Sequence, residues 1–237
     1  MAATSICICG ESGSGKSTSL RNLDPKETFI IATIAKPLPF RGWKKNYTKL
    51  VIDKDENGNT KSITGNYYVS DKWDKIIKIM KLVSAKMPHI KNLIVDDLQY
   101  TMAFEFVDRA SEKSYDKFNE MAQHLLSIFR TTFELRNDLT VVFLTHSENV
   151  GTEIDPKYTI KTLGKLLKEK VTTEGLFTCL LFTEVEMEDD GAHYQFITNA
   201  DGRCIAKSPL GMFDSLKIDN DLKEIIPVVK AYEEEEE

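Results

Sequence analysis

A glycine-rich loop that ends in a lysine and a serine occupies residues 10–17, which read GESGSGKS. The loop satisfies the pattern G-x-x-x-x-G-K-[ST], the P-loop or Walker A motif, whose backbone N–H groups surround the phosphates of a nucleotide. We expect Lys16 to reach the β- and γ-phosphates of ATP and the hydroxyl of Ser17 to bind Mg²⁺. The residues predicted to contact the nucleotide are Gly10, Glu11, Ser12, Gly13, Ser14, Gly15, Lys16, Ser17 and Thr18.

Two adjacent carboxylates end the apolar stretch NLIVDD at residues 92–97. A P-loop protein needs a carboxylate at the end of a neighbouring strand to complete its Mg²⁺ site. We therefore predict that Asp96 and Ser17 together hold Mg²⁺, and that Asp97 orients the water that attacks the γ-phosphate. Two aspartates after a strand are by themselves often a helix cap, so this prediction depends on the P-loop.

A third strand-like stretch that ends in polar residues is FLTHSE, residues 143–148. His146 is expected to lie beside the γ-phosphate, where a polar side chain can sense the phosphate and move an adjoining loop. The alternative is a loop histidine that is satisfied by local hydrogen bonds.

Strands and helices alternate around these motifs. Short apolar or β-branched runs predict buried strands, and apolar residues at three- and four-residue spacing predict helices. The expected strands are residues 5–9, 28–34, 92–97, 140–148, 176–188, 192–200 and 204–208. The expected helices are residues 16–23, 71–86 and most of 104–137, and residues 157–175 are expected to be part loop and part helix. This order predicts an α/β fold whose mainly parallel sheet has an antiparallel C-terminal edge.

Residues 51–69 predict a β-hairpin around the turn formed by Asn57 and Gly58. Several oxygen-bearing side chains of this stretch also fit the first half of a calcium-binding EF-hand loop. Thr64, however, stands where that loop needs a bidentate glutamate, and the flanks are strand-like. The hairpin is therefore the favoured interpretation.

The composition is that of an ordinary globular domain: the 237 residues are 41% hydrophobic and 29% charged. We expect one core domain over residues 1–232 and an acidic tail over residues 233–237. The tail supplies five of the six net negative charges, so the rest of the chain is close to neutral and can carry a basic face.

The sequence also excludes several classes of protein. It has no run of about 18 apolar residues and no basic segment followed by an apolar segment at its start, so neither a membrane span nor a secretion signal is expected. The cysteines lack the spacing of a zinc site and are expected to be reduced core thiols in a cytosolic protein. They are Cys7, Cys9, Cys179 and Cys204.

The order of these motifs resembles the RecA/Rad51-like ATPases. The stretches KPLPFRGW, TGNYYVSDKWDKI and DGRCIAKSPLG resemble more narrowly the short, phage-encoded, single-domain recombinases of the single-strand annealing type, which are AAA ATPase-like nucleotide-binding proteins. The resemblance covers roughly residues 4–215. It implies a three-layer RecA-like P-loop NTPase core without a domain in front of it.

In that family ATP lies between adjacent subunits, and basic residues of one subunit reach the γ-phosphate that the next subunit holds. The resemblance assigns this catalytic role to Arg203 and Lys207, whose charge would stabilise the transferred phosphoryl group. RecA-like ATPases usually place a catalytic glutamate at the end of the second strand, whereas this chain has no acid between Glu27 and Asp53. Either Asp97 or Glu11 then orients the water, or hydrolysis is slow.

Two segments combine the charge and shape that single-stranded DNA needs. Residues 36–49 interleave basic side chains with the rings of Phe40, Trp43 and Tyr47, as in grooves that stack bases. The basic residues of this segment are Lys36, Arg41, Lys44, Lys45 and Lys49. Residues 157–170 follow the sensor strand, where the resemblance implies a DNA-binding loop that ATP orders. Their lysines are Lys157, Lys161, Lys165, Lys168 and Lys170. The alternative for residues 36–49 is that their aromatic rings pack on the sheet. The alternative for residues 157–170 is that their lysines form a solvated helix face.

These features predict an ATP-binding, Mg²⁺-dependent ATPase that acts on single-stranded DNA in phage recombination or replication, in the host cytosol. The expected partners are single-stranded DNA and further copies of the chain in a ring or filament, with a single-strand DNA-binding protein as a further candidate. Two alternatives stay open: a nucleotide-gated loader with little hydrolysis, and a small-molecule kinase, which the absence of an arginine-rich lid disfavours. The acidic tail either solubilises the chain or competes with DNA.

Overall fold

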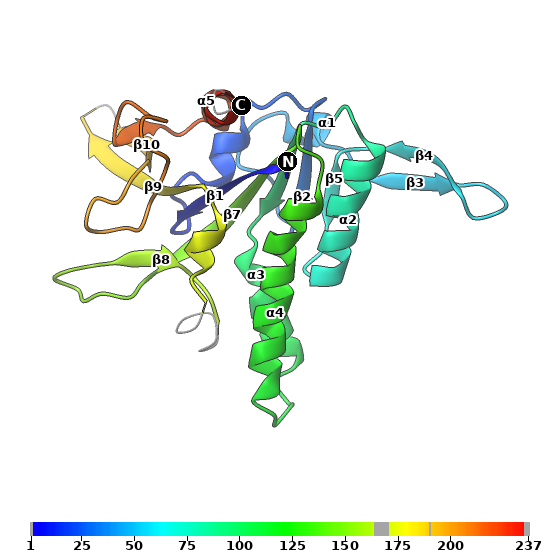
Figure 1. Ribbon diagram of the computed structural model, residues 1–237, viewed down its shortest axis with the longest axis horizontal. Coiled ribbons are helices and arrows are strands. Elements are labelled where there is room, and N and C mark those ends of the chain that lie inside the picture. Colours follow the sequence, from blue (N-terminus) through cyan, green and yellow to red (C-terminus); the bar gives the residue numbers. More distant parts are fainter. Residues whose placement is uncertain (1, 164–170, 190, 235–237) are drawn as a thin grey trace.

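A computed structural model describes residues 2–163, 171–189 and 191–234. Within these residues one sheet contains nine strands in the order β11-β10-β9-β1-β7-β6-β2-β5, with β8 added to the end of β7 (Figure 1). The strands of this sheet are β1 (Thr4–Gly10), β2 (Thr28–Ala32), β5 (Tyr67–Val69), β6 (Asn92–Asp96), β7 (Thr140–Asn149), β8 (Tyr158–Ile160), β9 (Cys179–Glu188), β10 (Gly191–Ile197) and β11 (Lys217–Asp219).

The centre of the sheet is parallel and its C-terminal edge is antiparallel. Each neighbouring pair from β9 through β1, β7, β6 and β2 to β5 is parallel, whereas β10 pairs antiparallel with both β9 and β11. Strands β2 and β6 are buried along their whole length, as parallel strands covered on both faces must be. The predicted α/β fold class is confirmed, including the antiparallel edge.

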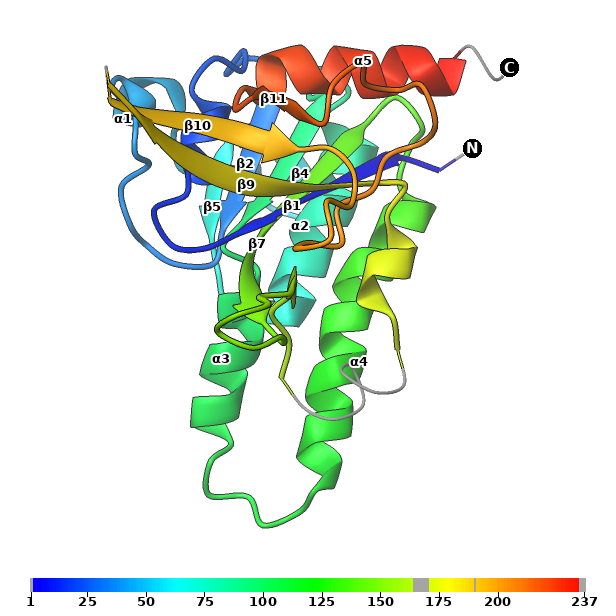
Figure 2. The ribbon, with the colours of Figure 1, turned by 90° about the vertical axis from the view of Figure 1, so that its left-hand side faces the viewer.

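Helices cover both faces of the sheet, so the protein has three layers (Figure 2). On one face, α2 (Trp73–Lys86), α3 (Gln99–Asp108) and α4 (Asp116–Thr131) contribute to a core that contains Phe29, Val95 and Phe143. On the other face, the 3-10 helix η1 (Ser17–Leu20) and α5 (Leu222–Glu234) pack on residues such as Ile30 and Ile94. Successive strand residues therefore belong to different cores, as the pleat of a strand requires.

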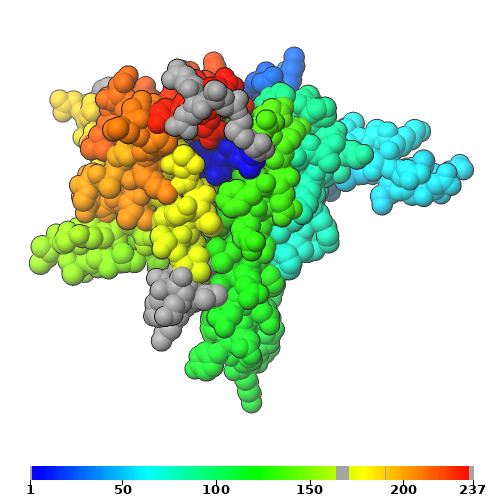
Figure 3. Space-filling view, viewed as in Figure 1, coloured from blue at the N-terminus to red at the C-terminus, as the bar shows by residue number. Residues whose placement is uncertain are grey.

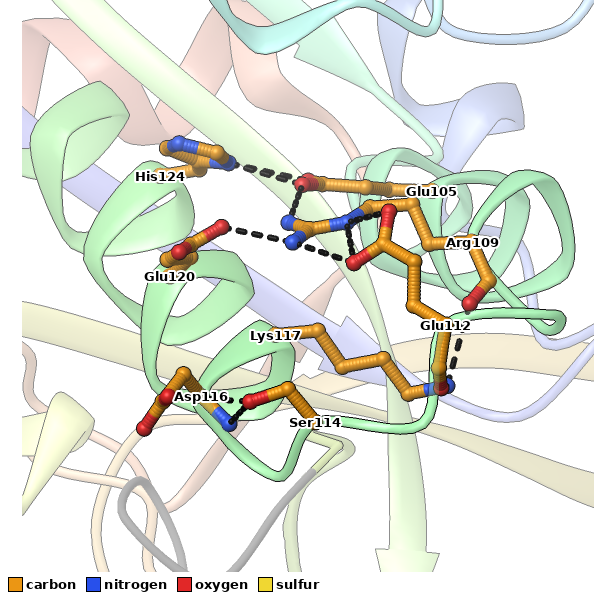
Figure 4. Close-up of polar contacts among 8 residues, drawn as sticks. All are labelled: Glu105, Arg109, Glu112, Ser114, Asp116, Lys117, Glu120 and His124. Atoms are coloured by element: carbon orange, nitrogen blue, oxygen red, sulfur yellow. Dashed lines mark hydrogen bonds and ion pairs between the residues drawn. The ribbon is translucent and has the colours of Figure 1, made fainter.

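Residues 104–137, which were expected to be mostly helical, contain the end of α3, the whole of α4 and the 3-10 helix η2 (Thr132–Glu134). Helices α3 and α4 form an antiparallel pair (Figure 2). The hydroxyl of Ser114 accepts a hydrogen bond from the backbone N–H of Asp116 at 3.1 Å, which favours a turn before α4 over a continuous helix. Figure 4 shows that Arg109 then joins the two helices through Glu105, Glu112 and Glu120. The α3–α4 pair extends away from the sheet in Figures 1 and 2.

Two predictions of local structure were wrong. The expected helix at 16–23 is only the 3-10 helix η1, because this short segment ends at Asp24-Pro25 and the Ser19 hydroxyl bonds back to the carbonyl of Lys16 at 2.6 Å. The expected strand at 204–208 is irregular and makes only isolated bridges, to Tyr158 and Leu180.

The predicted hairpin consists of β3 (Val51–Lys54) and β4 (Thr60–Thr64) around the turn that contains Gly58, which has a φ of 82°. The carboxylate of Asp55 accepts hydrogen bonds from the backbone of Asn57 and Asn59, so it serves the turn. The hairpin stands out from the body in Figure 3. The remaining short elements are α1 (Trp43–Asn46) and the 3-10 helix η4 (Thr173–Leu176).

Helix α5 reaches Glu234, so the first two glutamates assigned to the acidic tail are helical, and residues 235–237 lie outside the described residues. Among the helices that the structure describes, none has the length and apolar character that would be needed to cross a membrane.

Candidate functional site

The P-loop follows directly from β1 and holds its lysine inside the protein. Lys16 is 5% exposed, and its Nζ donates hydrogen bonds to the carbonyls of Gly10 at 2.9 Å and Glu11 at 2.7 Å. Burial lowers the pKa of Lys16, while Asp97, Cys9 and Asp96 act in the opposite direction. The lysine is thus held at the loop by neutral carbonyls, which the oxygens of a phosphate can replace.

Glycine is required at the turn of the loop. Gly13 and Gly15 have φ values of 81° and 94°, which side-chain-bearing residues rarely adopt. A Cβ on Gly15 would also lie 2.8 Å from the ring of Tyr194 on β10. The backbone conformation that exposes the N–H groups to a ligand therefore depends on these glycines.

The hydroxyl of Ser17 and the carboxylate of Asp96 meet at the end of the sheet. Ser17 Oγ donates to Asp96 Oδ1 at 2.9 Å and to Oδ2 at 3.1 Å. A hydroxyl and a carboxylate are hard oxygen ligands, and Mg²⁺ usually combines one or two carboxylates with substrate phosphates and water. These two residues therefore fit the predicted Mg²⁺ site. Among the described residues, no group of three or more histidine, cysteine, aspartate or glutamate side chains is arranged to hold a metal.

The two neighbouring aspartates have opposite electrostatic environments. Asp96 is 2% exposed, and burial together with the charge of Asp97 raises the pKa of Asp96 to about 6. Burial would also raise the pKa of Asp97, but His146 and Lys36 outweigh burial and lower that pKa to about 2. Asp97 is therefore a strongly stabilised carboxylate.

The backbone of Asp97 is in the left-handed region, with a φ of 61°. Such a conformation costs energy for a residue other than glycine and persists where the surroundings impose it. Here the hydroxyl of Thr33 donates to the carbonyl of Asp97 at 2.6 Å, and the N–H of Leu98 donates to the carbonyl of Leu144 at 3.0 Å. The residue that follows β2 and the middle of β7 thus hold the backbone of Asp97 in this conformation.

Lys36 and His146 flank Asp97. Lys36 Nζ forms an ion pair with Asp97 Oδ2, and His146 Nε2 lies 3.5 Å from Asp97 Oδ1. The sequence predicted His146 for this place but assigned Lys36 to a DNA-binding segment. Because Lys36 comes shortly after β2, at the edge where the other strands present their functional residues, its position along the chain was a signal that could have identified it.

One cavity of about 360 Å³ brings most of these residues together. It contains the P-loop lysine and serine, Asp97 and His146, so residues that follow β1 and β6 line one space together with a residue of β7. The lining residues are Ser12, Gly13, Gly15, Lys16, Ser17, Thr18, Lys36, Pro37, Pro39, Asp97 and His146. Gly10, Glu11 and Ser14 instead line a second cavity of about 310 Å³.

Arg203 lines the second cavity and pairs with residues of the same chain. Its Nη2 donates to Glu184 Oε1 at 2.9 Å, and its Nε donates to Asp201 Oδ2 at 3.2 Å. Lys207 forms two backbone hydrogen bonds with Leu180, each of 2.8 Å. Neither residue lines the cavity that contains Lys16.

The two predicted DNA-binding segments are placed differently. In the first segment Tyr47 is 3% exposed, and Phe40 and Trp43 pack against the core on the α5 side of the sheet. In the second segment, residues 164–170, with Gly164, Lys165, Lys168, Glu169 and Lys170, lie outside the described residues. Lys161 is exposed, and its N–H donates to the carbonyl of His146 at 2.8 Å. That hydrogen bond connects the second segment to His146, the predicted sensor residue.

The sequence profile of the AAA domain family matches residues 2–210 of this chain. A comparison with curated proteins gave no match. Among solved structures the chain is similar to a KaiC-like protein from the hyperthermophilic archaeon Pyrococcus horikoshii. The two are 12% identical, the similarity covers 83% of this chain and 78% of that chain, and the TM-score is 0.45.

Proposed function

The chain belongs to the AAA domain family, and we propose that it is a Mg²⁺-dependent ATPase that acts on single-stranded DNA in phage recombination or replication. The observation that carries the proposal is the meeting of Lys16, Ser17 and Asp97 in one cavity, with Asp96 bonded to Ser17. Lysine, hydroxyl and carboxylate are the groups that P-loop proteins direct at ATP and Mg²⁺.

Each residue has a defined task in this proposal. Lys16 exchanges its two carbonyl partners for oxygens of the β- and γ-phosphates. Ser17 and Asp96 would hold Mg²⁺, which would neutralise charge on the phosphates. Asp97 is the carboxylate that lines the cavity with Lys16, and in this proposal it accepts a hydrogen bond from the attacking water.

The link to DNA runs through His146 in this proposal. A contact between His146 and the γ-phosphate shifts the end of β7, and Lys161 is bonded to the backbone of His146 at 2.8 Å. The basic segment that begins near Lys157 then changes its affinity for the phosphates of the DNA backbone. ATP thereby controls DNA binding.

Self-association is part of the proposal, because Arg203 and Lys207 do not line the cavity that contains Lys16 of the same chain. A neighbouring copy in a ring or filament supplies these charges to the γ-phosphate. Arg203 must then release Glu184 and Asp201, its partners within the subunit.

A second candidate function is a nucleotide-gated module that hydrolyses little ATP and loads a protein onto DNA. The specific observation in its favour is that Asp97 is already paired with Lys36 and contacts His146. A carboxylate that is neutralised in this way orients water poorly until a partner is displaced.

The test combines ATPase measurement with gel filtration, with and without single-stranded DNA. We expect assembly in the presence of ATP and an ATPase rate that rises when DNA is added. A strict monomer whose ATPase rate ignores DNA contradicts the proposal. ATP-dependent DNA binding without turnover selects the second candidate, and phosphoryl transfer to a nucleoside monophosphate identifies a kinase instead.

A further inference from the structure

Lys36 lines a part of the nucleotide cavity that is not formed by the P-loop. It follows β2, and the cavity lining includes Lys36 together with Pro37 and Pro39 of the same loop. Proline fixes φ, so this part of the loop has few backbone conformations. The base of the Lys36 side chain is therefore held beside the cavity.

The Lys36 side chain itself has room to turn. It is 46% exposed, whereas the Asp97 side chain with which it pairs is 4% exposed. Lys16, in contrast, is 5% exposed and bonded to two backbone carbonyls. Of these two lysines in the cavity, Lys36 is the one whose charge can move without opening the P-loop.

The arrival of ATP changes the balance of charge in this cavity. Asp97 is the ion-pair partner of Lys36 in the described structure, and a γ-phosphate that is bound by Lys16 adds a second anion to the same space. A doubly charged phosphate attracts an ammonium group more strongly than one carboxylate does, and a charge-assisted hydrogen bond of this kind is short and strong.

We propose that Lys36 exchanges partners, pairing with Asp97 in the nucleotide-free protein and with the γ-phosphate in the ATP-bound protein. Lys36 is then a specificity residue that distinguishes a nucleoside triphosphate from a diphosphate. Its departure leaves Asp97 free to accept a hydrogen bond from water. This inference rests on the proposed function, since it requires that ATP binds at the P-loop.

The exchange also accounts for the unusual chemistry at the end of the second strand. The sequence supplies no acid between Glu27 and Asp53, and the loop after β2 instead brings a cation to the cavity. The carboxylate of the site is that of Asp97, which follows β6. Its availability depends on Lys36 in the loop after β2.

The experiment measures equilibrium binding of a non-hydrolysable ATP analogue and of ADP, both with Mg²⁺, to the full chain. The variants are Lys36→Met, Asp97→Asn and the double variant, with Lys54→Met on the exposed β3–β4 hairpin as the matched control. We expect Lys36→Met to weaken binding of the analogue roughly 10- to 100-fold, as the loss of one charge-assisted hydrogen bond does. Binding of ADP should stay within about threefold, an effect smaller than one ordinary hydrogen bond.

The double variant separates exchange from simple repulsion. Asp97→Asn frees Lys36, so it should strengthen analogue binding, and this gain should disappear when Lys36 is absent. An equal gain in both backgrounds overturns the exchange, as does an equal loss of ADP and analogue binding in Lys36→Met.

A loss of folding can be distinguished from a loss of binding. If Lys36→Met unfolds because Asp97 loses its partner, the double variant is compared with Asp97→Asn, since neither of them contains the buried charge. If the unmodified protein binds neither nucleotide, the proposed function itself has failed. If it binds both and the Lys36→Met substitution changes the affinities for the analogue and for ADP by the same factor, only the exchange is wrong.

Discussion

Ser17 and Asp96 lie 79 positions apart in the sequence, yet the Ser17 hydroxyl donates to both carboxylate oxygens of Asp96, at 2.9 and 3.1 Å. Strand β1 leads into the P-loop and β6 ends at Asp96, and both are parallel to β7, which lies between them. Parallel strands bring their carboxyl ends to one edge of the sheet, where ligands bind. This edge therefore concentrates the residues whose replacement should change function.

Replacement of Asp96 by asparagine should stabilise the nucleotide-free protein and abolish Mg²⁺-dependent nucleotide binding. The pKa of Asp96 is raised to about 6, so the folded state binds more protons than the unfolded state between about pH 4 and pH 6. Stability consequently falls as the pH rises through this window. The gain from Asp96→Asn should reach about 1 to 3 kcal/mol at pH 7 and vanish below about pH 4, since each tenfold change in proton affinity corresponds to about 1.4 kcal/mol.

Urea unfolding at pH 3.5, 5 and 7.5 measures this effect, and exposed Asp214 provides the control substitution Asp214→Asn. A gain in stability that is the same at all three pH values would show that the buried charge is not its cause.

Replacement of Lys16 by alanine should weaken ATP binding about 100-fold or more, because two charge-assisted hydrogen bonds to phosphates are lost. Nucleotide-dependent DNA binding should be lost with it. Fluorescence titration with labelled ATP and labelled single-stranded DNA measures both, and Lys26→Ala at an exposed turn is the control. DNA binding that still responds to ATP in Lys16→Ala would refute nucleotide gating.

Removal of Arg203 should lower the ATPase rate without weakening ATP binding to a single subunit, because Arg203 lies outside the nucleotide cavity. Mixing Arg203→Ala subunits with Lys16→Ala subunits should restore part of the activity. Some interfaces in the mixture combine an intact P-loop with an intact arginine. No recovery over a range of mixing ratios, with mixed assemblies verified, would argue against a role across the interface.

Replacement of Lys117 by methionine should loosen the connection between α3 and α4. Lys117 is 7% exposed, and its Nζ donates to the carbonyls of Arg109 at 3.0 Å and Glu112 at 2.8 Å (Figure 4). Loss of these bonds should lower the local opening free energy by about 2 kcal/mol. Hydrogen exchange at residues 109–117 measures the change, with Lys113→Met as the exposed control. Nucleotide affinity should not change, since this end of the helical pair lies away from the cavity.

The cysteines should react slowly with thiol reagents in the folded protein at pH 8. Burial raises the pKa of Cys204 to about 11 and of Cys179 to about 12, and it raises those of Cys7 and Cys9 well above their usual value. Thiolate is the reactive form, so half-buried Cys204 should react first and the three buried thiols only on unfolding. Comparison of labelling rates in buffer and in denaturant checks this order. Fast labelling of Cys7 in buffer would contradict the buried position of β1.

The sequence by itself was sufficient for the features that depend on local pattern. The P-loop has a fixed spacing because its backbone must turn around a phosphate, so Lys16 and Ser17 were identified without any knowledge of the fold. Alternation of apolar strands and helices predicted the α/β class with its antiparallel edge, since two-sided burial requires continuous apolar strands. The hairpin at Gly58 was predicted because its turn requires a positive φ.

Tertiary structure decided that Lys36 pairs with Asp97. Lys36 read as part of a basic aromatic segment, and only the parallel pairing of β2 with β6 brings it against Asp97. The break between α3 and α4 depends on Arg109 and Lys117, whose partners lie across the turn, and helical periodicity cannot reveal such contacts. Local propensity acts over a few neighbouring residues, whereas the charge around Asp97 is set by three chain segments that meet only after the sheet has formed.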